Sequence, residues 1–219
     1  MPLDLYYHPV SPYCRSVLLT ARAVGVDLNL KKVDLFNKEQ LKPEFVAINP
    51  QHTVPTLVDG DLTLWESRVI CTYLVNKYGK DDSLYPKDPK ARAKVDAILH
   101  FDIGTLANRW AQLFLPIKSG KAKKPCQEHV DKLHEALEWL DGFLKGVKFA
   151  AGTDHVTVAD LVLISNVSSY QAAGFVVEHY VNINSWIAKC KQAMEGYEEL
   201  NGEGAKSFGD FVRSMIKDE

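Results

Sequence analysis

The segment from Asn49 to Tyr73, NPQHTVPTLVDGDLTLWESRVICTY, constrains the fold more than any other part of the chain. After Val54-Pro55, apolar and polar residues alternate around Asp59-Gly60, which predicts a β-hairpin over 56–64. Proline excludes the α-region for the residue before it, so Val54 is expected to be extended, with its own N–H and C=O free to face outward. Such a backbone is a template for pairing another short backbone.

Glu66 and Ser67 follow the hairpin at the start of an amphipathic helix. The first N–H groups of a helix lack partners and lie at its positive end, so they suit a carboxylate, whereas Glu66 suits an ammonium. Taken singly, Ser67 is equally well a helix N-cap and Glu66 a first-turn charge. Together with Val54, they predict a pocket for a zwitterionic amino-acid end joined to a peptide backbone.

The second group of reactive residues is YYHPVSPYCR at 6–15, where a strand enters a short loop and a helix begins near Pro12 to Cys14. Ser11-Pro12-Tyr13-Cys14 is similar to a glutaredoxin Cys-Pro-Tyr-Cys motif with serine in place of the first cysteine. Dithiol chemistry uses that first, low-pKa cysteine. A serine hydroxyl there can instead stabilise a thiolate that the ligand brings. On this motif alone, an N-cap role for Ser11 is an equally good explanation.

Composition excludes several classes of function. A net charge of −2 and a pI near 6.4 argue against nucleic acid as a partner. Four widely spaced cysteines show neither zinc spacing nor a disulfide framework, and free thiols indicate a reducing compartment. With no visible secretory leader and no uncharged run long enough to span a membrane, the chain is expected to be soluble and cytoplasmic. The one basic cluster, Lys118 to Lys124, is expected to be a solvated loop.

The pattern of the chain changes near residue 79. Before it, we predict a strand at 3–8, a helix at about 14–24 ended by Gly25, and a second strand at about 28–35. The polar segment Gly79 to Pro89 is expected to be a linker. Beyond it the pattern is helical: one face runs from Val95 to Phe114 and is expected to stop at Pro116, and a second spans 130–144. The prediction is an α/β domain over 1–79, a linker over 80–89 and an all-α domain over 90–219.

A site that binds a short peptide by its amino-acid end and ionises a thiol fits glutathione. The whole chain resembles a cytosolic glutathione S-transferase, most like the insect Delta class, with the Epsilon class second. The resemblance rests on four segments: YYHPVSPYCRSVLLTARAVGV at 6–26, NPQHTVPTLVDGDLTLWESRVI at 49–70, FDIGTL at 101–106 and TVADL at 157–161. It implies a thioredoxin-like first domain, a cis Val54-Pro55 bond and a homodimer. It also implies glutathione as co-substrate, with no cofactor and no metal.

The resemblance also implies roles for individual residues. Ser11 falls where the Delta-class catalytic serine falls. The expected glutathione-binding residues are His52, Val54, Pro55, Glu66, Ser67 and Arg68. The expected lining of a pocket for hydrophobic electrophiles is Pro12, Leu35, Ala107, Trp110, Phe114 and Phe208, with Phe211 as an alternative to Phe208. Asp102 matches an acid near the dimer-facing side of the site. Thr157 and Asp160 match a helix-capping pattern with a structural role.

Three residues depart from the Delta-class pattern. Tyr13 stands where the class usually has proline, so the loop after Ser11 is expected to differ in shape. Gln40 stands where many of these enzymes carry a histidine near the glycine carboxylate, and Ala107 replaces a common tyrosine.

Two functions from other classes compete with glutathione conjugation to hydrophobic electrophiles in detoxification. One is thiol–disulfide exchange through Cys14, although a cysteine one turn inside a helix is more often buried and structural. The other is a non-catalytic ligand-binding module, which the presence of Ser11 together with Glu66 and Ser67 disfavours.

Overall fold

The computed structural model describes residues 3–216, and its only sheet within that range has four strands in the order β2-β1-β3-β4. The strands are β1 (Leu3–Tyr7), β2 (Leu28–Lys32), β3 (Thr56–Asp59) and β4 (Leu62–Leu64). β1 pairs with β2 in parallel and with β3 antiparallel, and β3 and β4 form the predicted hairpin. Parallel pairing requires a crossover connection, which α1 (Pro12–Val24) supplies.

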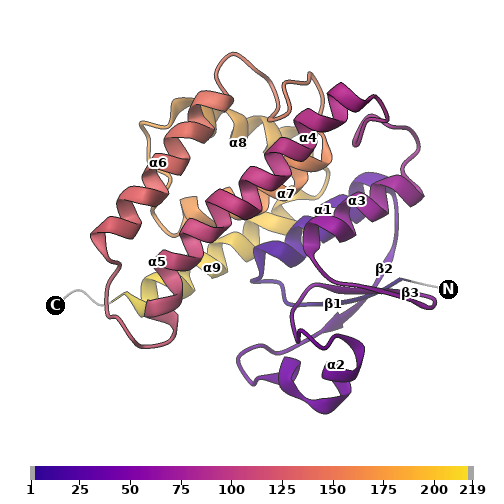
Figure 1. The fold of residues 1–219 in the computed structure, drawn as a ribbon, viewed down its shortest axis with the longest axis horizontal. Helices are drawn as coiled ribbons and strands as arrows, with labels where there is room; N and C mark the ends of the chain where they lie inside the picture. Colours follow the sequence, from indigo (N-terminus) through magenta and orange to yellow (C-terminus); the bar gives the residue numbers. More distant parts are fainter. Residues whose placement is uncertain (1–2, 217–219) are drawn as a thin grey trace.

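Two helices cover the face of the sheet that is turned toward the rest of the molecule. Figure 1 shows α1 and α3 (Ser67–Tyr78) between the sheet and the later helices, with α2 (Pro43–Ile48) on the opposite side. α1 ends at Gly25, whose φ of 72° is the left-handed conformation that glycine adopts at a helix C-terminus. A short 3₁₀ turn, Glu39–Leu41, precedes α2. This arrangement is the thioredoxin-like α/β domain that the sequence predicts.

Residues after α3 form no strand within the part of the chain described, which confirms the predicted all-helical region. The helices are α4 (Pro89–Phe101), α5 (Asn108–Lys118), α6 (Gln127–Phe143), α7 (Val158–Ala172), α8 (Val181–Ala193) and α9 (Glu203–Met215). π-helical turns at Asp102–Ala107 and Glu198–Gly202 precede α5 and α9. Neither helix nor strand occupies 79–88. The domain limits at 79 and 90 stay a prediction.

α7 is the central helix of the molecule. Every residue from Val158 to Tyr170 is buried, because α1, α4, α8 and α9 all pack around it. The capping box forms as predicted: the Asp160 carboxylate accepts from the Thr157 backbone N–H at 2.9 Å and from its hydroxyl at 2.9 Å. Asp160 also accepts from Ala150 N–H at 2.8 Å and from the Trp186 indole at 2.9 Å. One carboxylate thus joins α7, the loop before it and α8.

Two expected element limits are corrected, and one helix was missed. The predicted stop at Pro116 is wrong, because proline lies in the last turn of α5, where it removes only one hydrogen bond and α5 continues to Lys118. The second strand ends at Lys32 rather than near Leu35, since the Asp34 carboxylate accepts from Phe36 N–H at 2.9 Å and Asn37 N–H at 3.1 Å and turns the chain. α2, only six residues long, was not predicted.

Candidate active site

A cleft of about 600 Å³ lies between the α/β domain and the helical region. That volume is typical of a small-molecule site. Its α/β wall consists of His8, Val10, Ser11, Pro12, Tyr13, Leu35, Phe36, Gln40, His52, Thr53, Val54, Pro55, Glu66, Ser67 and Arg68. Its helical wall consists of Ile103, Trp110, Ala111, Phe114, Leu115, Lys118, Asn166, Phe208 and Phe211. The polar residues gather mainly on the first wall and the aromatic residues on the second.

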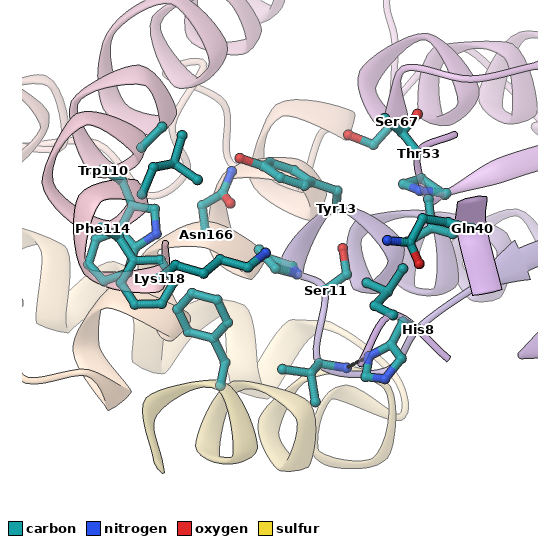
Figure 2. A pocket seen from close by; sticks show the side chains of 18 of the residues that line it. His8, Ser11, Tyr13, Gln40, Thr53, Ser67, Trp110, Phe114, Lys118 and Asn166 are labelled. Carbon is teal, nitrogen blue, oxygen red and sulfur yellow. Dashed lines mark hydrogen bonds between the residues drawn. The ribbon is translucent and has the colours of Figure 1, made fainter. Parts of the chain in front are cut away.

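Ser11 caps α1 at the edge of this cleft (Figure 2). Its backbone is extended, and its C=O accepts the N–H groups of Cys14 and Arg15, both at 3.1 Å. Its hydroxyl makes no capping hydrogen bond, so the N-cap position is confirmed without the usual use of the side chain. The hydroxyl therefore lies beside the positive end of α1 as a donor for a group in the cleft.

Cys14 is fully buried one turn into α1. Its Sγ accepts the His8 N–H at 3.4 Å. Burial raises the pKa of the Cys14 thiol from 9.0 to about 11, and the His8 N–H, the neighbouring Ser11 hydroxyl and the Arg15 charge oppose this rise only in part. A buried, protonated thiol is a poor nucleophile, so the geometry does not favour exchange chemistry at Cys14.

Tyr7, the other residue that could supply a hydroxyl from β1, packs against the hydrophobic core and does not line the cleft. Tyr13 does line it, one residue beyond Pro12. Burial raises the pKa of the Tyr13 phenol, and the Arg68 guanidinium carbon lies 5.5 Å from the centre of its ring. Sequence reasoning noted Tyr13 only as a change in loop shape, although its place within the SPYC motif is a signal for the site.

The loop before β3 presents Val54 to the cleft. The Val54-Pro55 bond is cis, as the family resemblance implies. Pairing of β1 with β3 stops at Tyr6 opposite Thr56, so Val54 lies beyond the ladder. The buried Asn49 amide holds this loop, donating to the Thr53 carbonyl at 3.2 Å and the Thr56 hydroxyl at 2.9 Å. Asn49 begins the segment on which the sequence argument rests, but its positioning role was missed.

Glu66, Ser67 and Arg68 form the corner between β4 and α3, and all three line the cleft. Glu66 has a φ of 69°, an uncommon conformation for a residue with a side chain. Ser67 is the first residue of α3, so its N–H belongs to the unpartnered first turn. The corner brings one carboxylate and one helix N-terminus together, as the sequence predicts.

Arg68 has a second role behind the cleft wall. Its guanidinium donates to the Asp102 carboxylate, which in turn accepts from the Asn166 amide at 2.9 and 3.1 Å. Asp102 is fully buried behind Arg68 and does not line the cleft itself, and its expected place near the dimer-facing side of the site stays a prediction. Burial raises the pKa of Asp102, while the Arg68 charge and the Asn166 hydrogen bonds oppose that rise. The three residues connect α3 to the helical region.

Five of the six residues expected in the electrophile pocket line the cleft: Pro12, Leu35, Trp110, Phe114 and Phe208. Phe211 lines it as well. Ala107 does not; it is buried, and Ile103 and Ala111 face the cleft instead. The reason is the π-helical segment 102–107, whose wider turns rotate the residues before α5 relative to an α-helix. The Trp110 ring stacks on Tyr170 with centroids 4.6 Å apart, which fixes this aromatic wall.

His52 and Gln40 lie on the α/β wall near Thr53. His52 has a φ of 47°, and its side chain is exposed to the cleft. The side-chain oxygen of Gln40 is buried without a hydrogen-bond partner among the residues described. Gln40 therefore reaches the site despite replacing the family's usual histidine. Asn166 and Lys118 also line the cleft and were not predicted there: no sequence pattern pointed to Asn166, and Lys118 was expected to lie in a solvated loop.

No three His, Cys, Asp or Glu side chains between residues 3 and 216 are grouped as they would be around a metal ion. In the same part of the chain, no helix combines the length and the apolar character required to cross a bilayer.

Fold and site together define a thioredoxin-like domain joined to a helical region, with a half-polar, half-aromatic cleft between them. Residues 5–82 match the family model of the glutathione S-transferase N-terminal domain. The chain is 46% identical over 221 aligned residues to glutathione S-transferase D7 of Anopheles gambiae, covering 97% of this chain and 98% of that protein. The chain therefore belongs to the glutathione S-transferase family and is an enzyme of that family.

Two solved structures allow the chain to be compared with the Delta and Epsilon classes of the family. A delta-class glutathione transferase of Nilaparvata lugens has a TM-score of 0.93 and 51% identity, covering 98% of this chain and 100% of the other. An epsilon-class enzyme of the housefly, Musca domestica, has a TM-score of 0.91 and 39% identity, covering 97% and 98%. The order of similarity, Delta before Epsilon, confirms the resemblance stated from the sequence.

Proposed function

We propose that this glutathione transferase ionises the glutathione thiol with the Ser11 hydroxyl and conjugates the thiolate to hydrophobic electrophiles in detoxification. The observation that carries the proposal is the Ser11 side chain, which stands at the N-cap of α1, makes no capping hydrogen bond and lines the cleft. A hydroxyl donor and a helix N-terminus both favour the charged form of a thiol, which lowers its pKa.

Glutathione is proposed to lie along the α/β wall. Its γ-glutamyl ammonium would pair with Glu66, and the adjacent carboxylate would meet Ser67 and the N–H groups at the start of α3. The cysteinyl backbone would pair with Val54 beside Pro55, and the glycine carboxylate would lie near His52. Arg68 lies in the same part of the wall and would contact the γ-glutamyl end. Its positive charge is already paired with the Asp102 carboxylate, so it would not supply an unpaired charge to the ligand.

In the proposed reaction, the thiol proton leaves to solvent and the thiolate attacks an electrophilic carbon. A carbon–sulfur bond forms, and with an aryl halide the halide leaves with the bonding electrons. Pro12, Leu35, Trp110, Phe114 and Phe208 would hold the apolar part of the electrophile. Because these side chains exclude water from the cleft, the hydrogen bond from Ser11 to the thiolate becomes stronger.

We expect a cytoplasmic homodimer in which 1–79 binds glutathione and 90–219 supplies most of the electrophile pocket. Support for the dimer comes from the family resemblance, and light scattering would give twice the chain mass of 24.6 kDa.

The test is conjugation of an aryl halide by the purified protein and two variants. Ser11→Ala removes the proposed donor and should slow conjugation about tenfold to a hundredfold, equivalent to about 2–3 kcal/mol of barrier. Tyr7→Phe removes the competing hydroxyl, whose side chain packs against the core and does not line the cleft, and should leave most of the rate. If Tyr7→Phe abolishes turnover and Ser11→Ala does not, the serine assignment is wrong.

A further inference from the structure

We propose that Lys118 selects electrophiles that carry a negatively charged group, such as an aryl carboxylate, and this inference rests on the proposed conjugating function. Lys118 is the last residue of α5 and lines the cleft beside Phe114 and Leu115. In Figure 2 its side chain extends from α5 into the cleft in the direction of Ser11. An ammonium group is thus placed within a mostly aromatic wall.

Lys118 lies there because α5 continues past Pro116. Proline in the last turn leaves the helix intact as far as Lys118, and the chain then reverses at Gly120, whose φ is 72°. The Pro116 carbonyl accepts the N–H groups of Lys121 and Ala122 at 2.9 and 3.1 Å. These bonds turn the following residues back over the end of the helix, so Lys118 is the basic residue of this segment that lines the cleft.

The Lys118 charge has no counter-ion within residues 3–216, where no carboxylate lies within 4.0 Å of its ammonium. Among the residues that the structure describes, Glu66 is the one carboxylate that lines the cleft, and it belongs to the opposite, α/β wall. Arg68, the other cation at the cleft, is already bonded to Asp102. A negatively charged ligand on the aromatic side would therefore meet an uncompensated positive charge.

Glutathione does not use this charge in the proposed pose. Its two carboxylates are assigned to the start of α3 and to the region of His52 and Gln40, and Figure 2 shows Ser67 and Gln40 across the cleft from Lys118. What remains for Lys118 is the second substrate. Lys121, Lys123 and Lys124 follow in the sequence, but none of them lines the cleft.

A lysine in the last turn of a helix also complements the helix dipole. That structural role alone predicts a loss of stability on substitution, with no effect on which substrate is preferred. Substrate preference is therefore the informative readout.

The experiment compares chlorodinitrobenzene with chlorodinitrobenzoate, which share the leaving group and differ by a carboxylate. The ratio of kcat/KM for the benzoate to that for the neutral compound should fall about three- to tenfold in Lys118→Met, as expected for loss of a partly screened ion pair. Lys118→Arg should retain the ratio, and Lys118→Glu should lower it further. Added salt should lower the ratio in the unaltered protein.

Lys121→Met is the matched control, since it removes a charge from the same segment at a position that does not line the cleft. Its ratio should remain that of the unaltered protein. An unchanged ratio in Lys118→Met, or an equal fall in Lys121→Met, would overturn the inference, as would a raised KM for glutathione in Lys118→Met. Failure of the unaltered protein to conjugate either compound would instead contradict the proposed function on which the inference rests.

Discussion

Ser11 is the N-cap of α1 and Cys14 lies one turn further along the helix. The two side chains differ in their access to the cleft, and therefore in the chemistry that they can take part in. The serine hydroxyl borders the cleft, whereas the thiol is fully buried with its pKa raised to about 11. At neutral pH only a minute fraction of such a thiol is ionised. The sequence therefore keeps three residues of the glutaredoxin-like motif, but its one remaining cysteine is buried and not accessible to a substrate.

Cys14→Ala should accordingly keep most conjugating activity and lower stability by about 1–2 kcal/mol, the cost of a small cavity. In the folded protein, alkylation of Cys14 should stay slow at pH 7–9 and rise only as the pH approaches about 11, because the raised pKa disfavours the thiolate below that value. Mass spectrometry after exposure to an alkylator and to oxidised glutathione checks both points. The exposed Cys126 serves as the internal control. A prompt glutathione adduct on Cys14, with activity lost in the variant, would support the redox alternative.

Residue types and spacing were enough to predict Ser11, Val54, Glu66 and Ser67 at the cleft, because each follows a local rule for a helix start or a proline step. Ala107 was placed wrongly and Lys118 was missed, since both positions depend on helix phase and length. Those quantities are set by a π-turn and by a tolerated proline. A periodicity of 3.6 residues does not predict either.

At the scale of elements, α7 depends most on one side chain. Asp160 accepts hydrogen bonds from Ala150, Thr157 and Trp186, and all three partners are buried. Removing the carboxylate would leave buried donors unpaired at the start of the central helix. The capping box was visible in the sequence, but the contacts to Ala150 and Trp186 were not, because they form only in the folded chain.

We expect Asp160→Ala to reduce the free energy of unfolding by about 3–5 kcal/mol, because several buried donors lose their acceptor at a cost of about 1–3 kcal/mol each. Asp154→Ala, in the exposed loop just before, should change it by less than about 0.5 kcal/mol. Urea unfolding followed by tryptophan fluorescence gives both values. Equal effects of the two substitutions would show that Asp160 does not organise this region.

At the scale of the whole molecule, two buried arginines join the α/β domain to the helical region. Arg15 on α1 donates to the Asn201 side chain at 2.6 Å and to the Ser169 hydroxyl, and Arg68 on α3 donates to Asp102. Gly204 permits the close approach near Arg15, since a Cβ there would lie 2.5 Å from the Pro9 carbonyl oxygen. The sequence predicts two domains, but the contacts between them join residues far apart in the chain and could not be predicted from local patterns.

Asp102→Asn should therefore affect both stability and binding. It leaves the Arg68 charge buried without a carboxylate, so we expect a loss of about 3–5 kcal/mol in unfolding free energy. It should also raise the KM for glutathione, because Arg68 lies in the wall of the proposed binding site. The double variant Arg68→Met with Asp102→Leu removes both charges and should recover much of the stability but not the KM. If Asp102→Asn leaves both quantities unchanged, the pair does not couple the two parts of the molecule.

The central claim is that the Ser11 hydroxyl lowers the pKa of the glutathione thiol in the cleft. Ultraviolet titration of thiolate in the complex measures that pKa directly, in the unaltered protein and in Ser11→Ala. We predict a value at least about one unit below the ordinary 8.5 for the unaltered protein, equivalent to about 1.4 kcal/mol of preferential thiolate stabilisation, and a return toward 8.5 in the variant. A lowered pKa that persists in Ser11→Ala and is lost in Tyr7→Phe would contradict the account.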